Sequence, residues 1–342
     1  MITASPGTRQ PARLTPAWQT EMAQAISDPQ ELCSLLGLDP ALVLPARAAA
    51  QSFALRVPRG FVARMRRGDP SDPLLRQVLP MGAELHSPAH HSGDPLHEAA
   101  ALRAPGLLHK YRGRALLIAT GACAVHCRYC FRREFPYSEQ NDAAGRWAGA
   151  LEVLRQDASI SELLLSGGDP LSLNDARLTQ LTAQLRDIPH LRRLRIHTRQ
   201  PIVLPSRVDD GLLAWLGALP WRVVMVLHCN HANEIDAEVR AACARLRDAG
   251  VTLLNQTVLL AGINDEPATL EALSEALWQA GVLPYYLHLL DPVNGTAHFD
   301  VPELRARQLL GALSGALPGY LVPRLVREVP GATAKVSIAP LL

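Results

Sequence analysis

Lysine is nearly absent from this sequence. Lys and Arg together number 34 in 342 residues, but only two of them, Lys110 and Lys335, are lysines. Arginine therefore serves almost everywhere that a cation is needed, and the two positions that keep lysine are candidates for lysine-specific chemistry. An ordinary surface lysine is the alternative interpretation at each position.

A charge excess and long apolar runs are missing as well. The 34 basic residues face 32 acidic ones, for a formal net charge of +2, which is too balanced for a nucleic-acid binder. No apolar run approaches the roughly 18 residues that span a bilayer. Residues 1–20 show neither a signal-peptide apolar core nor an Arg-rich amphipathic pattern. We expect a cytoplasmic protein that contacts neither nucleic acid nor membrane.

Cysteines are too few for a disulfide framework. The chain has six, and in a reducing compartment clustered thiols indicate metal or redox chemistry instead. Cys33, Cys229 and Cys243 are scattered, whereas the other three fall within one short segment. That segment is the first candidate for a functional site.

Short apolar runs alternate with longer amphipathic segments from residue 114 onward. The apolar runs predict strands at residues 115–120, 162–166, 193–198, 223–228, 252–260 and 284–290. The amphipathic segments predict helices at residues 145–156, 174–187, 209–219, 234–249, 267–280 and 302–317. Six successive βα units predict an α/β fold with a parallel sheet. Residues 18–104 before them read as helical and irregular.

Polar or glycine-rich residues follow the predicted strands. The cysteine segment comes after the first strand and a Ser-Gly-Gly-Asp turn, residues 166–169, after the second. His228, Gln256 and Asp291 fall at or near the ends of the fourth, fifth and sixth strands. In parallel βα barrels, active sites are built from this rim. The sequence therefore directs several loops at one pocket.

Cys123, Cys127 and Cys130 form a C-x3-C-x2-C loop directly after a predicted strand. Three thiolates bind three irons of a [4Fe-4S] cluster, and the lack of a fourth nearby cysteine leaves one iron free for another ligand. That open position suits chelation of S-adenosylmethionine (SAM). A zinc site is the alternative, but zinc usually takes paired C-x2-C or Cys/His sets. The loop therefore predicts an iron-sulfur cluster.

Several segments together resemble the radical SAM lysine 2,3-aminomutase family. The segments that carry the resemblance are residues 121–137, 164–171 and 287–299 and the tail around Lys335. In its length and in residues 56–65 and 72–80, the chain is most similar to the short bacterial branch that acts in β-lysylation of elongation factor P.

The resemblance implies three regions. A helical N-terminal region is expected at residues 1–104 and a radical SAM core, a partial (β/α)6 parallel barrel, at residues 105–300. A C-terminal helix and a short segment that binds pyridoxal 5′-phosphate (PLP) are expected at residues 301–342.

Four residues are expected to bind PLP through this resemblance. Lys335 matches the lysine that holds PLP as a Schiff base, and the stretch before it has the composition of a flexible segment. Bound PLP supplies an electron sink. Lys110, Tyr111 and Arg114 match positions that hold the ring and phosphate, although an ordinary basic surface is the alternative for these three.

The residues expected to bind SAM share a place at strand ends: Ser166, Gly167, Gly168, Asp169, His228 and Gln256. The glycine turn is interpreted as a place where backbone approaches a ligand closely. For the last two residues, a buried hydrogen-bonded polar pair is the alternative.

Three charged residues match the family's substrate contacts. Arg132 corresponds to the arginine that pairs with the substrate α-carboxylate, a task suited to a planar bidentate donor. Asp291 and Glu328 correspond to the acidic pair that receives the ε-ammonium, and two carboxylates around one cation select a long basic amino acid. Glu328 stands where the family pattern leads us to expect Asp, which alters the expected pocket length. Surface carboxylates are the alternative.

The implied function is PLP-dependent isomerisation of L-lysine to (R)-β-lysine, destined for elongation factor P through a separate lysyl ligase. An external electron donor is required as well. One alternative is an aminomutase that makes free β-lysine for metabolism, and another is a non-catalytic iron-sulfur redox module. The second alternative leaves Lys335 and the acidic pair unexplained.

Two further features complete the sequence-based expectations. Glu266 stands where longer aminomutases carry a cysteine, and the chain lacks their cysteine-bearing tail, so we expect no structural zinc. A basic stretch holds five arginines, Arg56, Arg59, Arg64, Arg66 and Arg67. A solvated face is favoured there over a docking surface for an acidic partner.

Overall fold

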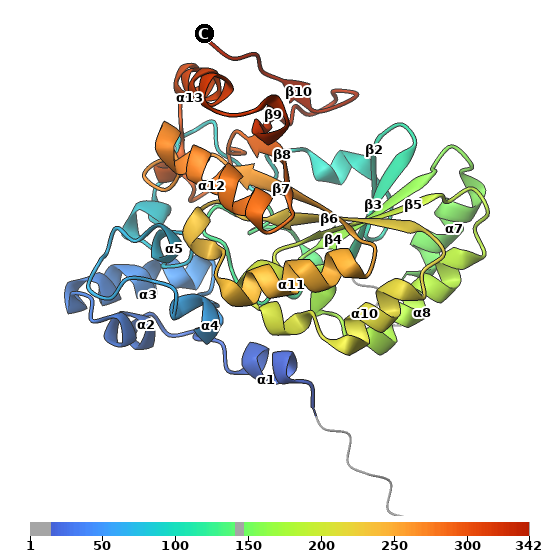
Figure 1. Cartoon of the computed structure of the whole chain (residues 1–342), viewed down its shortest axis with the longest axis horizontal. Coiled ribbons are helices and arrows are strands. Elements are labelled where there is room, and N and C mark those ends of the chain that lie inside the picture. Colours follow the sequence, from blue (N-terminus) through green and yellow to red (C-terminus); the bar gives the residue numbers. More distant parts are fainter. Residues whose placement is uncertain (1–14, 141–146, 342) are drawn as a thin grey trace, which may run out of the picture.

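The computed structural model describes residues 15–140 and 147–341. Its sheet has ten strands that neighbour one another in chain order. They are β1 (Leu102–Ala104), β2 (Leu107–Tyr111), β3 (Arg114–Thr120), β4 (Glu162–Gly167), β5 (Arg193–Thr198), β6 (Arg222–His228), β7 (Thr252–Val258), β8 (Leu283–His288), β9 (Arg324–Arg327) and β10 (Val336–Ser337). Figure 1 shows this sheet above the N-terminal helices α1 to α5 (residues 17–76) and below the C-terminal helix α13 (Glu303–Ala316). Strands β3 to β9 run parallel, whereas β1, β2 and β10 add antiparallel pairs at the two edges. No pairing between β1 and β10 closes the sheet within the described residues.

The predicted α/β fold with a parallel sheet is confirmed. Strands β3 to β8 coincide with the six predicted strands, apart from one or two residues at some ends. The two edges were not predicted, because β1, β9 and β10 have only two to four residues and show no alternating pattern. Both edges carry residues that belong to the candidate site.

The predicted helices are present as well. They are α7 (Ala148–Gln156), α8 (Asp175–Arg186), α10 (Asp210–Gly217), α11 (Ala237–Asp248), α12 (Pro267–Gln279) and α13 (Glu303–Ala316). The prediction for α7 began at residue 145, and residues 145 and 146 lie outside the described part of the chain. Several starts follow from capping: Asn174, Asp209 and Asp236 each accept a hydrogen bond from a backbone N–H in the first turn of their helix.

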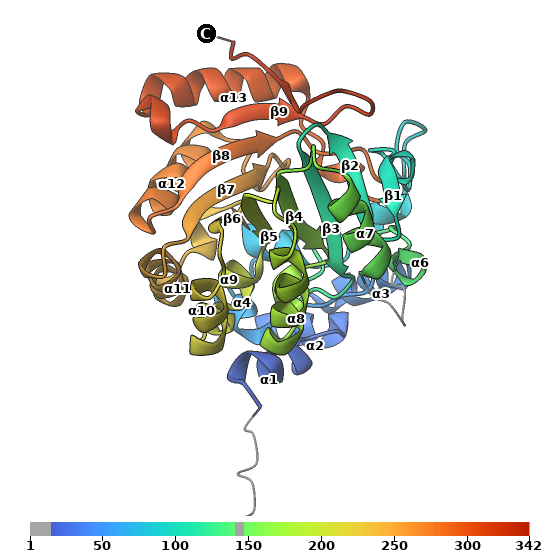
Figure 2. The same ribbon diagram turned by 90° about the vertical axis from the view of Figure 1, so that its right-hand side faces the viewer.

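The main core lies between the sheet and the helices that follow its strands. Leu178 of α8, Leu212 of α10 and Val239 of α11 are fully buried in one cluster with strand residues such as Leu163 and Met225. Figure 2 shows the strands side by side, with α7 and α8 over one face. Because these helices cover that face, the opposite face is available to line a cavity.

The N-terminal region is helical, as predicted. It contains α1 (Ala17–Ala23), α2 (Pro29–Leu36), α3 (Val43–Ser52), α4 (Arg59–Val62) and α5 (Pro73–Arg76). Its apolar cluster includes Ala124 and Val125, which belong to the cysteine loop. None of the described helices is long and apolar enough to cross a membrane.

The basic stretch is only partly a solvated face. Arg59, Arg66 and Arg67 are exposed, in agreement with the prediction. Arg56 and Arg64 are half-buried, and their guanidinium groups donate to the carbonyl oxygens of Met22 and Glu234, at 2.5 Å each. These two arginines therefore tie segments of the fold together.

Candidate active site

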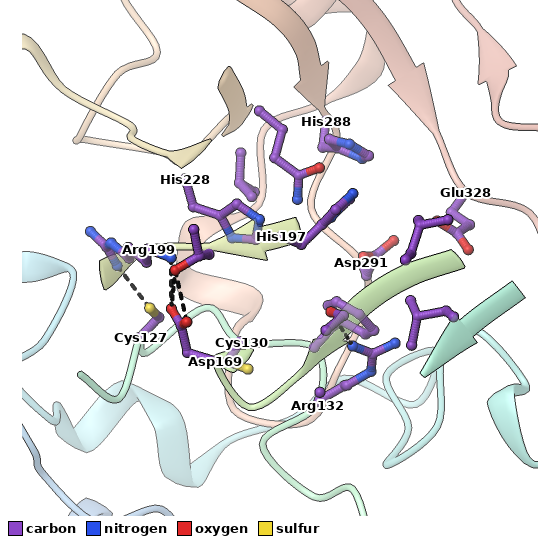
Figure 3. A pocket seen from close by; sticks show the side chains of 18 of the residues that line it. Cys127, Cys130, Arg132, Asp169, His197, Arg199, His228, His288, Asp291 and Glu328 are labelled. Carbon is purple, nitrogen blue, oxygen red and sulfur yellow. Dashed lines mark hydrogen bonds between the residues drawn. The ribbon is translucent and has the colours of Figure 1, made fainter. Parts of the chain in front are cut away.

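A cavity of about 670 Å³ lies against the open face of the parallel sheet. Residues at or just beyond the C-terminal ends of six strands contribute to its wall: Ser166, Thr198, His228, Val258, His288 and Glu328. Every residue that the sequence singled out for a cofactor or the substrate lines this cavity. Figure 3 shows Cys127 and Cys130 on one side and Asp291 and Glu328 on the other.

The three clustered cysteines form one end of the cavity. All three are free thiols. Burial, followed by the charge of Cys127, raises the pKa of Cys130 to about 11, and burial also raises the pKa of Cys123 well above its usual value. Buried thiols that resist ionisation in the protein alone become thiolates when a metal supplies the positive charge. The donor set therefore fits an iron-sulfur cluster.

The cysteine loop is held by the N-terminal region. Arg128, between two of the cysteines, is fully buried, and its Nε and Nη2 donate to the Glu84 carboxylate at 2.9 and 2.5 Å. Arg133 donates to the same carboxylate at 2.8 Å. The backbone N–H of Arg128 donates to the Gln77 carbonyl at 2.9 Å. The position of the cysteines therefore depends on residues about 50 positions upstream.

Replacing Glu84 should loosen this loop. In Glu84→Ala, the buried Arg128 and Arg133 lose their shared carboxylate, and we expect the free energy of unfolding to fall by about 3 kcal/mol. Iron content after reconstitution should fall too. Denaturant unfolding and iron analysis check this. Arg47→Ala, which breaks an exposed pair with Asp28, is the control and should cost less than about 1 kcal/mol; an equal loss in both variants would contradict the argument.

The glycine turn after β4 packs against the cysteine loop itself. A Cβ on Gly168 would lie 2.5 Å from the Ala122 carbonyl oxygen, and one on Gly167, whose φ is +115°, would lie 2.6 Å from the Thr120 oxygen. The close approach that requires glycine is therefore to another backbone segment of the chain. Both glycines still line the cavity beside Cys123.

Asp169 is a buried connector between two strand ends. Its carboxylate accepts hydrogen bonds from the Thr198 hydroxyl at 2.7 and 2.9 Å and from the Arg199 backbone N–H at 2.7 Å. The Leu171 N–H donates to it at 3.0 Å. These contacts fix the ends of β4 and β5 relative to each other, at the edge of the cavity.

Three histidines, of which His288 is buried and His197 and His228 are half-buried, line the cavity. The Nε2 atoms of His197, His228 and His288 are buried and have no hydrogen-bond partner within the described residues. Burial, then neighbouring cations, lowers the pKa of His228 to about 3, and burial lowers the pKa values of the other two well below the usual range. Neutral, unsatisfied ring nitrogens are the partners that a polar ligand needs. Gln256 lies beside His228 in the β6–β7 register.

The end opposite the cysteines is built by a β-hairpin. Strands β9 and β10 pair with Val336 opposite Arg327, which brings Lys335 to Glu328, at 2.5 Å between Nζ and Oε2. Lys335 therefore follows a structured turn, where the sequence suggested a flexible stretch. Burial alone would raise the pKa of Glu328, but Lys335 and Lys110 outweigh it and lower the value to about 2.

Asp291 has the opposite electrostatic character. It is placed just beyond β8, and burial, followed by the charge of Glu328, raises its pKa to about 7. The pKa of Asp291 is thus several pH units above that of the neighbouring Glu328. Such a pair gains strongly from a cation that binds between them.

Arg132, Lys110 and Glu98 continue the charged network. The Nε and Nη2 atoms of Arg132 donate to Glu98 at 2.7 and 2.9 Å, and its Nη1 donates to the Ser166 hydroxyl at 3.2 Å. Lys110 Nζ lies 3.2 Å from Glu98 and 3.1 Å from Glu328. Alternating charges therefore run from Arg132 to Lys335. Tyr111 and Arg114 face each other across β2 and β3 beside this network, with the guanidinium carbon 4.7 Å from the ring centre.

Sequence reasoning missed several residues of the cavity. Glu98 sits in an irregular segment without any periodic pattern. Arg195 and Arg324 also line the cavity. Both lie on strands, and the sequence did not show which residues of these strands face the cavity. Arg199 is not among the missed residues, because it belongs to the polar residues that follow the predicted strands and are expected at the rim.

Comparisons with known proteins decide the family. A family profile described as a 4Fe-4S single cluster domain matches residues 111–192. L-lysine 2,3-aminomutase of Escherichia coli (strain K12) is 49% identical over 322 residues, which cover 94% of each chain. The chain belongs to the radical SAM lysine 2,3-aminomutase family. The sequence-based predictions of this family, of a [4Fe-4S] cluster with SAM, and of an isomerase are confirmed.

Other relatives of the family differ in length. The Haemophilus influenzae L-lysine 2,3-aminomutase is 45% identical over 94% of this chain and 95% of its own. The Clostridium subterminale L-lysine 2,3-aminomutase is 34% identical over 94% of this chain but only 78% of its own. Among solved structures, a radical SAM methyltransferase from Sphaerobacter thermophilus aligns with a TM-score of 0.45 and 17% identity, over 65% of this chain and 68% of that one.

Proposed function

We propose that this protein converts L-lysine to (R)-β-lysine in a radical SAM, PLP-dependent isomerisation, and that the product serves β-lysylation of elongation factor P in the cytoplasm. The observation that carries the proposal is the charged lining of the cavity. A network of ion pairs starts at Arg132, beside the cysteine loop, and runs through Glu98, Lys110 and Glu328 to Lys335 at the opposite end, where Asp291 also lines the cavity. A zwitterionic amino acid with a second ammonium group complements such a surface.

The acidic pair would bind the ε-ammonium of the substrate. Glu328, with a pKa of about 2, is ionised throughout the physiological range, and Asp291, with a pKa of about 7, ionises fully when a cation arrives. A glutamate side chain would meet repulsion at this position, and a neutral side chain would bring no charge to Asp291, since Glu328 is already paired with Lys110 and Lys335. A long basic side chain is therefore favoured.

Arg132 would bind the substrate α-carboxylate by exchanging partners. In the protein alone, Glu98 occupies two of its donors. Burial opposes ionisation of Glu98, but Arg132 and Lys110 outweigh it and keep its pKa below the ordinary value. Because Lys110 lies 3.2 Å from Glu98, that carboxylate keeps a cationic partner when the substrate takes its place on Arg132.

Two cofactor sites fit the same cavity. Lys335, with Lys110, Tyr111 and Arg114 around it, would hold PLP, and the strand-end residues Ser166 to Asp169, with His228 and Gln256, would hold SAM. When bound, PLP would supply a conjugated π system that stabilises an unpaired electron while the amino group migrates, and the cluster with SAM, given one electron by the external donor, would supply a hydrogen-abstracting radical. The protein orients these groups and excludes water. The amino group and one hydrogen exchange carbons, so the reaction conserves every atom.

The proposed destination of the product rests on the resemblance to the short bacterial branch of the family. This chain is matched almost end to end by the Escherichia coli and Haemophilus influenzae relatives, whereas it spans 78% of the Clostridium subterminale protein. Sequence identity follows the same order, at 49% and 45% against 34%. The resemblance to the short bacterial branch implies a product that would pass to an elongation factor P lysyl ligase. Free β-lysine for metabolism remains the alternative.

The test is an anaerobic assay of the protein after reconstitution with iron and sulfide. With SAM, PLP, a one-electron reductant and L-lysine, we expect β-lysine by mass-resolved chromatography, with the (R) form identified by chiral separation. SAM cleavage without β-lysine would refute the substrate. To test the destination, deletion of the chromosomal copy in the source bacterium should leave elongation factor P without the β-lysyl mass increment; an unchanged factor would favour the metabolic alternative.

A further inference from the structure

We infer that Arg199 sets the reduction potential of the iron-sulfur cluster by donating an N–H to the Cys127 sulfur, with Glu234 moderating its charge. Arg199 thus acts on the cluster through its ligand and is a positioning residue. The inference requires the cluster but not the proposed substrate, so it can fail or succeed independently of lysine chemistry.

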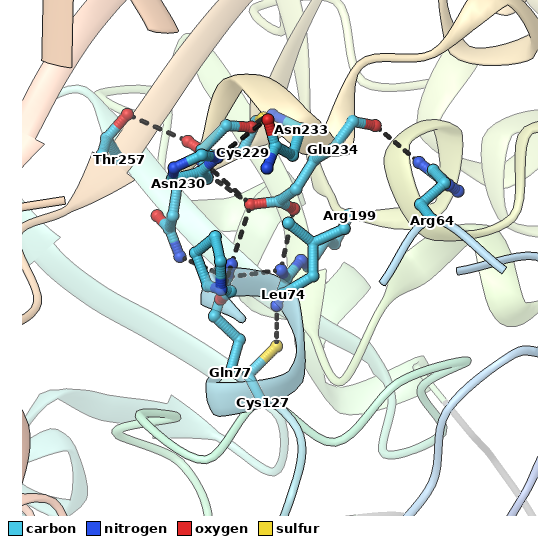
Figure 4. A network of polar contacts seen from close by, with 12 residues as sticks. Arg64, Leu74, Gln77, Cys127, Arg199, Cys229, Asn230, Asn233, Glu234 and Thr257 are labelled. Carbon is cyan, nitrogen blue, oxygen red and sulfur yellow. Dashed lines mark hydrogen bonds and ion pairs between the residues drawn. The ribbon is translucent and has the colours of Figure 1, made fainter. Parts of the chain in front are cut away.

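The contacts of Arg199 place its cation at the cluster ligand. Nη1 lies 2.8 Å from the Sγ of Cys127 and 2.7 Å from the hydroxyl of Tyr129. Nη2 donates to Gln77 at 2.7 Å and to Glu234 at 2.9 Å. The side chain is only 5% exposed. Figure 4 shows this arrangement, with the Arg199 side chain between Cys127 and Glu234.

Both ends of Arg199 are fixed. Its backbone N–H donates to Asp169 at 2.7 Å, which ties the end of β5 to the turn that follows β4. Its carboxylate partner is fixed too, because Glu234 is fully buried and its Oε1 accepts the backbone N–H groups of Asn230 at 2.9 Å and His231 at 3.1 Å. The guanidinium is therefore held beside Cys127 by contacts at both ends of the residue. It also stays positively charged, because arginine does not lose its proton in proteins.

A fixed cation beside a thiolate ligand favours the reduced cluster. Reduction adds one negative charge to the cluster, and hydrogen bonds to its sulfurs stabilise that charge. The effect is strong because burial limits solvent screening. The negative charge of Glu234 opposes reduction of the cluster. Its effect is weaker than that of Arg199, because Glu234 accepts from Nη2 and does not contact Cys127, whereas Nη1 donates to the Cys127 sulfur directly.

This geometry predicts shifts of opposite sign for the two partners. Arg199→Gln removes the cation and should make the cluster harder to reduce, whereas Glu234→Gln removes the opposing anion and should make it easier. A purely structural salt bridge predicts no such opposition, because either variant would only loosen the same contact. Arg199→Lys retains the charge without the planar fork and should fall between Arg199→Gln and the wild type.

The experiment is a potentiometric titration of the reconstituted full-length protein, followed by electron paramagnetic resonance, without SAM, PLP or lysine. At the wild-type midpoint, we expect the ratio of reduced to oxidised cluster in Arg199→Gln to fall at least tenfold, which is 59 mV for a one-electron couple. In Glu234→Gln the ratio should rise. Iron and sulfide are counted in every sample so that only loaded protein is compared.

Arg207→Gln is the matched control. Arg207 is another fully buried arginine, but its Nε and Nη2 donate to the Leu171 carbonyl and to Asp175, at 2.8 Å each, and it does not line the cavity. Its loss should lower thermal stability and leave the midpoint unchanged. An unshifted midpoint in loaded Arg199→Gln, or an equal shift in Arg207→Gln, would overturn the inference. If Arg199→Gln does not hold its cluster, Glu234→Gln decides: a higher potential supports the inference, and an unchanged or lower one refutes it.

Discussion

Lys335→Ala should abolish β-lysine formation while leaving the iron-sulfur cluster in place. The lysine stands at the end of the cavity opposite the cysteines, held by Glu328 at 2.5 Å. Its removal takes away the amine that would hold PLP, and we expect turnover to fall by at least about 1,000-fold. The visible absorbance of bound PLP should disappear, whereas the absorbance and iron content of the cluster should not change.

A nearby cation outside the cavity serves as the control for this experiment. Arg327 precedes Glu328 but pairs with Glu303 at the surface, with 43% of its side chain exposed. Arg327→Ala should therefore keep both turnover and PLP absorbance. If Lys335→Ala retained the PLP absorbance of the wild type, the assignment of this lysine would be wrong.

Asp291→Asn should lower kcat/KM for L-lysine between roughly 30-fold and 1,000-fold, equivalent to about 2 to 4 kcal/mol. The change removes one of two carboxyls expected to receive the ε-ammonium while preserving the size of the side chain. The other carboxyl, Glu328, remains ionised but is already shared by Lys110 and Lys335. Most of the loss should appear in KM, because the contact is made in the bound substrate as well as in the transition state.

The pH dependence of the wild type should carry the signature of Asp291. A carboxyl with a raised pKa is neutral below that value, so Asp291 loses its charge as the pH falls through about 7. The lysine ammonium stays protonated in this range. Accordingly, kcat/KM should fall about tenfold per pH unit below about 7, since this parameter reports the free enzyme. Glu328 does not titrate there.

The Asn variant provides the decisive comparison. In Asp291→Asn, the acidic limb assigned to residue 291 should be absent, and its kcat/KM should approach that of the wild type at low pH. Asp300→Asn, which changes an exposed carboxyl farther along the chain, should keep the wild-type profile. An unaltered acidic limb in Asp291→Asn would mean that another group controls it.

Much of the fold follows from local patterns. Runs such as residues 223–228 are long, apolar and followed by polar residues, so both the strand and its functional end can be predicted. The cysteine loop is recognised by its spacing together with its place directly after a predicted strand. The edge strands β9 and β10 are too short for such patterns, and β9, whose pairing with β10 brings Glu328 to Lys335, joins the sheet beside β8, a strand distant from it in the sequence.

The buried polar network is the part that sequence reasoning does not reach. Arg199 donates hydrogen bonds to Glu234, which is 35 residues away in the sequence, and to Gln77, which is 122 residues away. Arg132 meets Glu98 across 34 residues. No local period links such partners, because an ion pair in the interior is set by how whole elements pack. The sequence predicts that an arginine follows a strand, but the folded chain determines which atoms it contacts.

The scarcity of lysine has a practical consequence for anyone who handles this protein. Both of its lysines line the cavity, with side chains only 18% and 21% exposed. Reagents that acylate primary amines therefore find their targets at the amino terminus and inside the active site, and nowhere else on the chain. Labelling of the two lysines, separated from that of the amino terminus by peptide mapping, becomes a measure of whether the cavity is filled, and an amine-reactive support captures the protein without reaching the cavity only through the amino terminus.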